Sequence, residues 1–363
     1  MPDIVTNKIN PQLCFSVVTE CLDHLFGLIK SDGRFVYAHQ FDNKSWEYGG
    51  YNLLRHCGTV WFMCKAIDRL SLDIPPDWER QLSSAVLYVT NQLKPPPWNT
   101  GILPSLCLPS RGAVKIGGGG LCLLMLHEFV QLFQNRRIAQ HEGSSIPLDI
   151  ICARLENYLI SEMAHGDFIH KRSFSTGEVL PFRSDYYTGE VLFALIKRER
   201  TRPRAVDLLS ELMDRDYGIA EHSHWMAYAA SEALRQQLAH RQKTLGYLVR
   251  LISRIIAEPD YRTRHQSTPT ACRSEAFLTY LETFNDGGFP AASDHRDLLA
   301  PSYTSLVENL NLQLAFYGNG QFKRGSDSDK VQIDYIQHNG ASFLGLNLLH
   351  SERFGINTSQ PYQ

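Results

Sequence analysis

The feature that most constrains the fold of this chain is a regular alternation between two kinds of predicted helix. Apolar residues recur at helical spacing in twelve segments, which turn-forming residues separate. Every second segment has a charged face, whereas the segments between them are apolar almost all round. The amphipathic segments are Pro11–Ile29, Pro76–Leu93, Leu148–Met163, Ala205–Met213, Thr244–Ala257 and Leu298–Phe316. The apolar segments are Tyr51–Ile67, Gly118–Phe133, Tyr186–Ile196, His222–Leu234, Thr270–Phe284 and Tyr335–Leu349.

This alternation predicts a closed ring. A helix without a polar face must be surrounded by protein, so the apolar segments are expected inside and the amphipathic segments outside. No single pair buries its own apolar face, but a ring of six pairs buries all of them. We therefore predict an all-α fold, an (α/α)6 toroid, formed as one domain over residues 1–363. Because each inner segment begins with polar or glycine residues, these ends are expected to open onto a shared cavity.

The connections contain short pieces with strand character. Gly33–Phe41 precedes the first inner segment, and Gly166–Phe182 precedes the third and contains a predicted hairpin turn, Ser175–Gly177. Both are expected to line the mouth of the cavity. Leu93–Ser105 contains three consecutive prolines and is predicted to be an extended surface connection.

Composition and targeting signals narrow the possible partners. Lys plus Arg is 36 and Asp plus Glu is 38, a net charge of −2 that gives no reason to expect nucleic acid. No basic region followed by an apolar run is present at the N-terminus, and the longest apolar run, Leu121–Leu126, is too short to span a bilayer. We expect a cytoplasmic protein that binds a small molecule and no membrane. The oligomeric state stays open.

The eight cysteines form no CxxC pair. Cys14 and Cys21, like Cys57 and Cys64, are seven residues apart and share a helix face, which is typical of reduced core thiols. A structural zinc site needs closer clusters, so we expect no metal and no other cofactor.

Six helical pairs with strand insertions resemble the six-hairpin, (α/α)6 toroid superfamily. It includes glycoside hydrolases, polysaccharide lyases and sugar epimerases of the N-acylglucosamine 2-epimerase type. The resemblance covers nearly the whole chain and rests on the period of the helices. It implies an active site at one end of the ring, built from the starts of the inner helices. Epimerases of this fold use one Arg, one Glu and two His on inner helices.

Basic residues stand near the start of two inner segments. Tyr51 and Arg55 share a face, and the guanidinium of Arg55 is suited to hold a carboxylate, a phosphate or a sugar hydroxyl. Alternatively Arg55 pairs with an internal acid, and the adjacent His56 is a core residue. Lys115 precedes the glycine run 117–120, whose backbone N–H groups are candidates for anion binding. The alternative is that the glycines allow tight helix packing.

The third and fourth inner segments offer acids, aromatic rings and imidazoles. Asp185 is a candidate N-cap or substrate ligand. Tyr186 and Tyr187 are candidate binding residues beside Glu190. Burial would raise the pKa of the Glu190 carboxyl, which suits it to act as a general acid or base.

The fourth inner segment begins with two histidines. His222 and His224 diverge on a helix, which disfavours a shared metal. We therefore select His224 as the functional imidazole, with Trp225 as its stacking surface.

The last two inner segments carry isolated charges. Arg273 and Glu275 form a structural ion pair or face the cavity, since buried charges need partners. Asp334 and His338 share a face, which suits a carboxylate that orients an imidazole, or else an N-cap Asp and a core His. Tyr335 lies between them as a candidate binding residue.

These residues favour a carbohydrate-active enzyme that works by general acid–base chemistry. Glu190, His224, Glu275, His338 and Asp334 are the candidate catalytic groups. One Arg, carboxylates and two His suit proton abstraction beside a sugar carbonyl. Hydrolysis or lysis stays open, because Asp185 or Glu190 with Glu275, Asp286 or Asp334 would supply two carboxyl groups.

Two other classes remain as alternatives. A terpene-cyclase-like tailoring enzyme would have a cavity dominated by aromatic side chains, and the sequence has no Asp-rich DxDD motif. A non-catalytic binding toroid is the third possibility. Neither a GxSxG nor an HExxH motif is present, which disfavours serine hydrolysis and zinc proteolysis.

Overall fold

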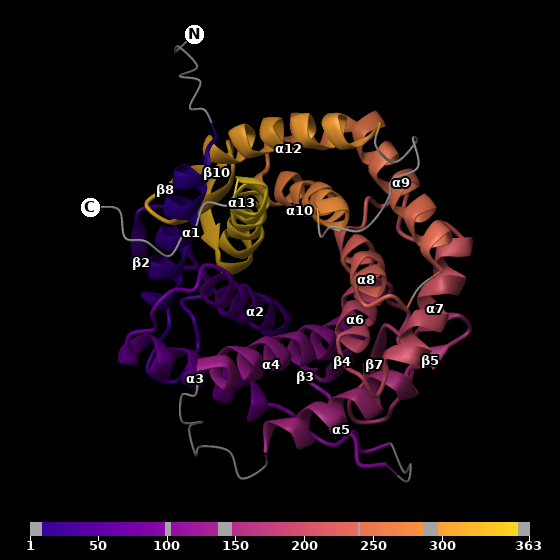
Figure 1. Cartoon of the computed structure of the whole chain (residues 1–363). Coiled ribbons are helices and arrows are strands. Elements are labelled where there is room, and N and C mark those ends of the chain that lie inside the picture. The colour runs from indigo at the N-terminus through magenta and orange to yellow at the C-terminus, as the bar shows by residue number, and fades with distance from the viewer. Residues whose placement is uncertain (1–8, 99–102, 137–146, 239, 286–296, 355–363) are drawn as a thin grey trace.

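A computed structural model describes residues 9–98, 103–136, 147–238, 240–285 and 297–354. The chain forms two concentric layers of helices (Figure 1). The inner layer consists of α2 (Leu53–Arg69), α4 (Ile116–Arg136), α6 (Tyr187–Ile196), α8 (His224–Arg235), α10 (Ser267–Asn285) and α13 (Ile333–Phe354). The outer layer consists of α1 (Pro11–Phe26), α3 (Pro76–Thr90), α5 (Leu148–Ser161), α7 (Arg202–Asp214), α9 (Arg241–Ala257) and α12 (Leu299–Leu314).

The fold is the predicted (α/α)6 toroid. Each inner helix contacts the next around the ring, and α13 returns to contact α2, which closes it. All twelve predicted segments are helices, with ends that differ from the prediction by a few residues. The inner helices bury side chains on all sides, as shown by α6, in which every residue from Tyr187 to Ile196 is buried.

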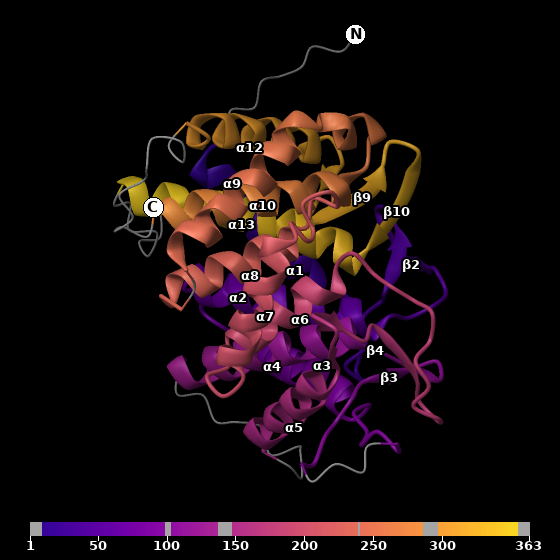
Figure 2. The same ribbon diagram turned by 90° about the vertical axis from the view of Figure 1, so that its right-hand side faces the viewer.

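Short strands gather at one end of the ring (Figure 2). One sheet has the order β2-β1-β10-β9-β8, formed by Asn43–Glu47, Ala38–Gln40, Ser328–Gln332, Gln321–Gly325 and Tyr317–Gly318. Its antiparallel β1–β10 pairing joins the segment before α2 to the segment before α13. Of this sheet, the sequence predicted only Gly33–Phe41. The strands β9 and β10 are charged and lack a clear apolar alternation, so they carry no strand signal.

A second sheet has the order β3-β4-β7, formed by Pro109–Ser110, Ala113–Lys115 and Lys171–Ser173. The hairpin predicted within Gly166–Phe182 forms only in part. Strand β7 pairs with β4, and the return arm meets β7 at the isolated bridge Arg172–Val179. A two-stranded unit, β5 (Met163–Ala164) and β6 (Asp167–Phe168), and the 3-10 helix Pro259–Arg264 complete the described elements. Part of the predicted Leu93–Ser105 connection lies outside the described residues.

Helix α4 is long and apolar enough to cross a membrane by length and composition, over Ile116–Phe133. However, 78% of this stretch is buried within the protein. A core helix passes the same test, so this single candidate among the described helices is weak evidence for a membrane span.

Close packing between inner helices depends on glycine. A Cβ atom added at Gly189 of α6 would lie 2.6 Å from Trp225 Cβ and 2.9 Å from the backbone N of Met226, both on α8. The backbone of α8 cannot move away without disturbing its other contacts in the ring.

We expect Gly189→Ala to lower the free energy of unfolding by ~1–3 kcal/mol through overpacking. Gly246→Ala on the outer helix α9 is the matched control. Its added Cβ would meet only Arg250 Nη1, at 3.5 Å, so the higher helix propensity of alanine should leave stability equal or improved. Urea denaturation of both variants measures the difference. Equal stabilities would contradict a close α6–α8 contact.

Candidate active site at the mouth of the ring

A cavity of about 340 Å³ opens at the end of the ring where the inner helices begin. Residues from all six inner helices line it. The predicted site residues among them are Arg55, Tyr186, Tyr187, Glu190, His224, Trp225, Asp334 and His338. The aromatic side chains are accompanied by many polar groups, so the lining does not favour a hydrocarbon substrate.

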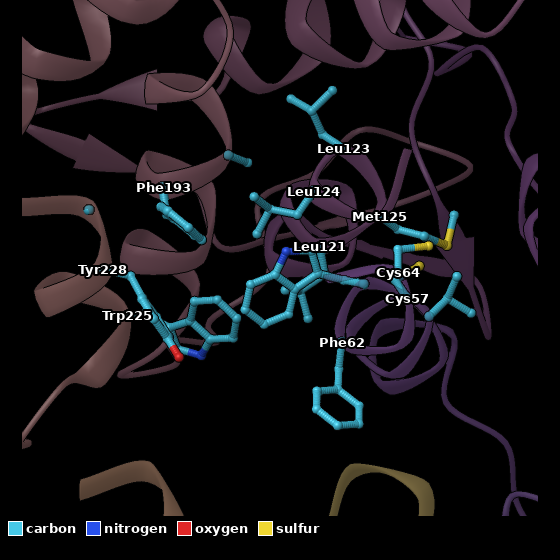
Figure 3. Close-up of a cluster of buried hydrophobic side chains, with 14 of the residues drawn as sticks. Cys57, Phe62, Cys64, Leu121, Leu123, Leu124, Met125, Phe193, Trp225 and Tyr228 are labelled. Carbon is cyan, nitrogen blue, oxygen red and sulfur yellow. The ribbon is translucent and has the colours of Figure 1, made fainter. Parts of the chain in front are cut away.

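A buried apolar cluster lies beside this cavity inside the ring. Side chains from α2, α4, α6 and α8 converge there (Figure 3). The Trp61 and Trp225 rings are 5.7 Å apart, and Phe193 stacks on Tyr228 at 5.3 Å. Because Trp225 belongs to both the cluster and the cavity lining, the cluster supports the walls of the site.

At the centre of the site, a chain of hydrogen bonds connects three inner helices. His338 Nδ1 donates to Glu275 Oε1 at 2.7 Å, and the Tyr228 hydroxyl donates to Glu275 Oε2 at 2.6 Å. Glu275 is 1% exposed and has both oxygens engaged. Burial opposes ionisation of Glu275, but His338 lowers the pKa of this carboxyl below its ordinary value. Glu275 therefore fixes the orientation of the His338 ring and stabilises its protonated form.

Cys272 and His224 face the same imidazole. Cys272 Sγ lies 3.9 Å from His338 Nδ1. Burial would raise the pKa of the Cys272 thiol, but His224 and His338 lower it to about 6. Burial likewise opposes protonation of His338, yet Cys272 and Glu275 raise its pKa well above the ordinary value. Both pKa shifts favour a thiolate–imidazolium pair over a neutral thiol and imidazole.

His224 is the least satisfied polar group of the site. It is 2% exposed, and neither ring nitrogen makes a hydrogen bond with a described residue. Its ring is 5.5 Å from that of His338, in an edge-to-face arrangement. His224 interacts electrostatically with Cys272, but a buried imidazole without a hydrogen bond is costly, so His224 is suited to interact with a bound molecule. His222 instead pairs with Glu258 at 3.1 Å and does not line the cavity. It lies before the N-cap of α8 and not on the helix, so its separation from His224 does not arise from the predicted helical divergence.

Four of these side chains offer donor atoms that a metal ion prefers. One atom each from His224, Cys272, Glu275 and His338 lies within 4.8 Å of the others. Imidazole, thiolate and carboxylate together suit zinc. In the present arrangement, however, His338 Nδ1 and Glu275 Oε1 are hydrogen-bonded to each other, so both would have to separate to bind an ion.

Glu190 is a buried acid beside the histidines. Burial raises its pKa to about 8, although His338 partly opposes this shift, and its Oε2 atom has no hydrogen-bond partner among the described residues. The carboxyl therefore carries a proton at neutral pH. A Cβ at Gly117 would lie 2.3 Å from this Oε2, so the glycine provides the space that Glu190 occupies. This supports the packing interpretation of the glycine run.

Arg55 is fixed at the rim by two partners. Its Nε lies 3.1 Å from Asp334 Oδ2, and its Nη1 donates to the Tyr37 hydroxyl at 2.9 Å. Gln332 donates to the other oxygen of Asp334 at 2.6 Å. Asp334 thus positions Arg55 rather than His338, which corrects the predicted Asp334–His338 pair. The Arg55 side chain is 41% exposed, so its guanidinium remains accessible to a ligand.

Several predicted binding residues lie elsewhere. Tyr51 donates to Nδ1 of the fully buried His56 at 2.6 Å, and His56 Nε2 donates to the Ala85 carbonyl at 3.0 Å. His56 is therefore a core residue.

Asp185 is exposed and lines neither this cavity nor the neighbouring one. It does not cap α6 either, because this helix begins after Tyr186 without a side-chain cap. Tyr335 lines neither cavity.

Two further predictions concern charged residues. The Arg273 guanidinium lies 5.6 Å from the Tyr261 ring, and Arg273 does not line the cavity. Glu275 lies beneath the cavity, so Arg273 and Glu275 do not act together. Lys115 belongs to a neighbouring cavity, together with Tyr51 and Arg55. Asp286 lies outside the described residues.

Sequence reasoning missed Cys272, Tyr228 and Tyr37. The cysteine pattern favours a core thiol at Cys272, yet this residue precedes Glu275 by three positions and therefore shares its helix face. Tyr228 likewise follows His224 by four residues. Tyr37 lies on the approach to β1 and reaches Arg55 only through the tertiary fold.

Comparison with known proteins supports the fold. No protein-family model and no curated protein matches this sequence. Among solved structures, D-mannose isomerase matches with a TM-score of 0.61 at 10% identity, over 94% of this chain and 98% of that chain. The likeness to D-mannose isomerase shows the (α/α)6 toroid fold and nothing more specific.

Two further solved structures match with TM-scores below 0.5, and nothing about this protein is inferred from them. The GH76A alpha-1,6-mannanase from Salegentibacter sp. HEL1_6 matches at 0.43 and 8% identity, over 93% of this chain and 99% of that chain. The endoglucanase from the termite Nasutitermes takasagoensis matches at 0.45 and 12% identity, over the same shares.

The charge arrangement at Cys272 is testable by alkylation. We expect iodoacetamide to modify Cys272 with an apparent pKa of about 6, because two imidazoles stabilise its thiolate. Cys14, Cys107 and Cys152 should react slowly at neutral pH, because burial raises each pKa to about 12. Mass spectrometry across pH 5–9 measures the rates.

The same measurement tests metal binding. A zinc-bound thiolate would be protected until the protein is dialysed against a chelator. Equal rates before and after dialysis are expected for the hydrogen-bonded arrangement. An apparent pKa of Cys272 above 8 would contradict the thiolate–imidazolium pair.

Proposed function

We propose that this protein is a sugar isomerase or epimerase that moves a proton at the carbon next to a sugar carbonyl. The observation that carries the proposal is the Tyr228–Glu275–His338 hydrogen-bond chain beside His224, whose ring nitrogens have no hydrogen bond with a described residue. One imidazole is hydrogen-bonded to a carboxylate and the other has no hydrogen bond with a described residue. Such a pair at one site suits the removal and return of a proton. The shared fold with D-mannose isomerase agrees with this chemistry.

In this mechanism, His224 takes the proton from carbon, because both of its ring nitrogens lack partners among the described residues. Charge then develops on the carbonyl oxygen as the enediolate forms. The protonated His338 and Glu190, with the guanidinium of Arg55, provide hydrogen-bond donors for that oxygen and for the neighbouring hydroxyl. Return of the proton to the other face of the same carbon epimerises it. Return to the adjacent carbon isomerises the sugar, provided that a proton also passes from the neighbouring hydroxyl to the former carbonyl oxygen.

The carboxylates do not favour glycoside hydrolysis. A glycosidase of this kind needs two carboxyl groups that can act on opposite sides of the scissile bond. Glu275 has both oxygens bonded to Tyr228 and His338, and Asp334 has both engaged by Arg55 and Gln332. Among the acids lining the described cavity, Glu190 alone has an unpartnered buried oxygen.

Exchange with deuterated water tests the reaction. We expect proton NMR to show deuterium at the carbon next to the carbonyl of at least one reducing sugar, from a panel of neutral and acidic aldoses and ketoses that includes D-mannose. His338→Asn and His224→Asn should each lower the exchange rate by roughly 10²–10⁴-fold, since each removes an acid–base group. The absence of exchange across the panel, or full activity of both variants, would refute the proposal.

His222→Asn is the matched control for these variants. His222 lies two residues from His224 but outside the cavity, and its positive φ of 55° is a conformation that asparagine tolerates. Its exchange rate should match that of the unmodified protein.

If the protonated form of Glu190 is needed for catalysis, activity should decline at alkaline pH. Because its pKa is raised to about 8, the proton is present below that pH and lost above it, so kcat/KM should fall above about pH 8. Glu190→Gln keeps a hydrogen-bond donor that does not titrate, and it should remove this alkaline decline while retaining activity at pH 7. An identical decline in the variant would exclude Glu190 as its cause.

A further inference from the structure

A second cavity, of about 500 Å³, adjoins the first on the outer side. Asn52, Leu54 and Arg55 line both cavities, so the two lie next to each other with these residues between them. Each volume lies within the ~300–1,000 Å³ range of small-molecule sites. The combined space accommodates a ligand with a second chemical group beyond its reacting end.

The outer cavity is strongly cationic. Arg55, Arg111, Lys115 and Lys171 line it, and no Asp or Glu is among its described lining residues. Arg55 has Asp334 as a partner, but Arg111, Lys115 and Lys171 form no ion pair with a residue that the structure describes. Three cations without an ion-pair partner among the described residues therefore share a concave surface with Arg55, whose charge Asp334 offsets, and this concentrates a positive potential there.

Two of these cations are placed directly opposite each other. Lys115 of β4 pairs in register with Lys171 of β7 in the antiparallel ladder. Like charges at directly opposed strand positions destabilise a sheet. Both amino groups lie over the same Phe182 ring, at 5.4 and 5.3 Å from its centroid, which holds them together. An anion between the two ammonium groups would relieve this repulsion.

Arg111 is brought to the same cavity by the β3–β4 turn. Its φ is 52° and that of the following Gly112 is 74°, so the turn places an arginine in the left-handed region. Few residues other than glycine, asparagine and aspartate adopt this conformation readily. The side chain extends toward Gly50, with Nη2 lying 3.7 Å from the position that a Cβ there would occupy. A larger residue at position 50 would narrow the space beside the guanidinium.

We propose that the outer cavity binds a phosphate or sulfate group carried by the substrate, held by Lys115, Lys171 and Arg111. Lysine ammonium groups act as point charges toward such oxyanions, and arginine adds a planar pair of donors. This inference deepens the proposed function, on which it rests: the substrate is an acidic sugar whose carbonyl end reaches His224 and His338. Arg55 stands at the junction between the two ends.

Calorimetric titration tests the anion site without any catalysis. The probes are inorganic phosphate, D-mannose 6-phosphate, D-mannose and D-glucuronate, at constant ionic strength. The unmodified protein should bind mannose 6-phosphate more tightly than inorganic phosphate, and both more tightly than mannose. The double variant Lys115→Gln/Lys171→Gln should weaken binding of both phosphates by at least about tenfold, because two charge-assisted contacts are lost.

Lys330→Gln is the matched control. Lys330 also lies over an aromatic ring, that of Tyr48 at 5.5 Å, but lines neither cavity. Its phosphate affinity should equal that of the unmodified protein. Circular dichroism melting of all variants shows that weaker binding does not reflect unfolding.

Four results would overturn the proposal, and the first three concern the anion site itself. They are no phosphate binding by the unmodified protein, equal affinity in the double lysine variant, and tighter binding of glucuronate than of mannose 6-phosphate. Equal affinity for inorganic and sugar phosphate would also overturn it, because the anion would then be a separate ligand.

The two proposals fail in distinguishable ways. If phosphate binding depends on the lysines but no sugar exchanges deuterium, the anion site stands and the proposed function fails. If neutral sugars exchange deuterium and no phosphate binds, the proposed function stands and the anion site fails.

Discussion

Burial of six apolar helices is the constraint on which the rest of the structure depends. None of these helices has a face that water could cover, so each needs protein on all sides. Two inner neighbours and an outer layer provide it. The polar residues at the N-terminal ends of the same helices cannot be covered by apolar side chains, because a buried polar group without a hydrogen bond is costly. They collect at one end of the ring, where the cavity forms among them. The position of the candidate site is therefore a consequence of the way the core is covered.

Charges within the site are stabilised by one another. Glu275 is nearly inaccessible to water, and a carboxylate in such a place is costly unless it is paired and hydrogen-bonded. His338 and Tyr228 meet both of its oxygens, and Cys272 further supports the charge on His338. A second acid, Glu190, has no such partner among the described residues and remains neutral instead. Glu190 in the cavity lining and Glu275 beneath it thus have pKa values shifted in opposite directions because their partners differ.

Sequence reasoning recovered the helices better than the contacts between them. Helical periodicity is a local property, so α2 and α13 were both predicted, and the ring followed from their character. The partner of His338 was not recoverable, because the sequence pattern allows both Asp334 and Glu275 to reach it. Packing decides between them: Arg55 and Gln332 occupy Asp334, while α10 presents Glu275. Strands β9 and β10 were missed since their pairing is set by the ring and not by their own apolar pattern.

Closure through the β1–β10 ladder has a consequence for how this protein is made. Ala38 meets Gln332, so residues synthesised almost three hundred positions apart must come together before the ring closes. Contacts of such long sequence separation slow folding, and incomplete chains leave apolar inner helices uncovered. During translation the first five helical pairs would emerge with an open seam where α12 and α13 belong. The nascent chain is thus exposed to aggregation until α13 has left the ribosome and packed against α2.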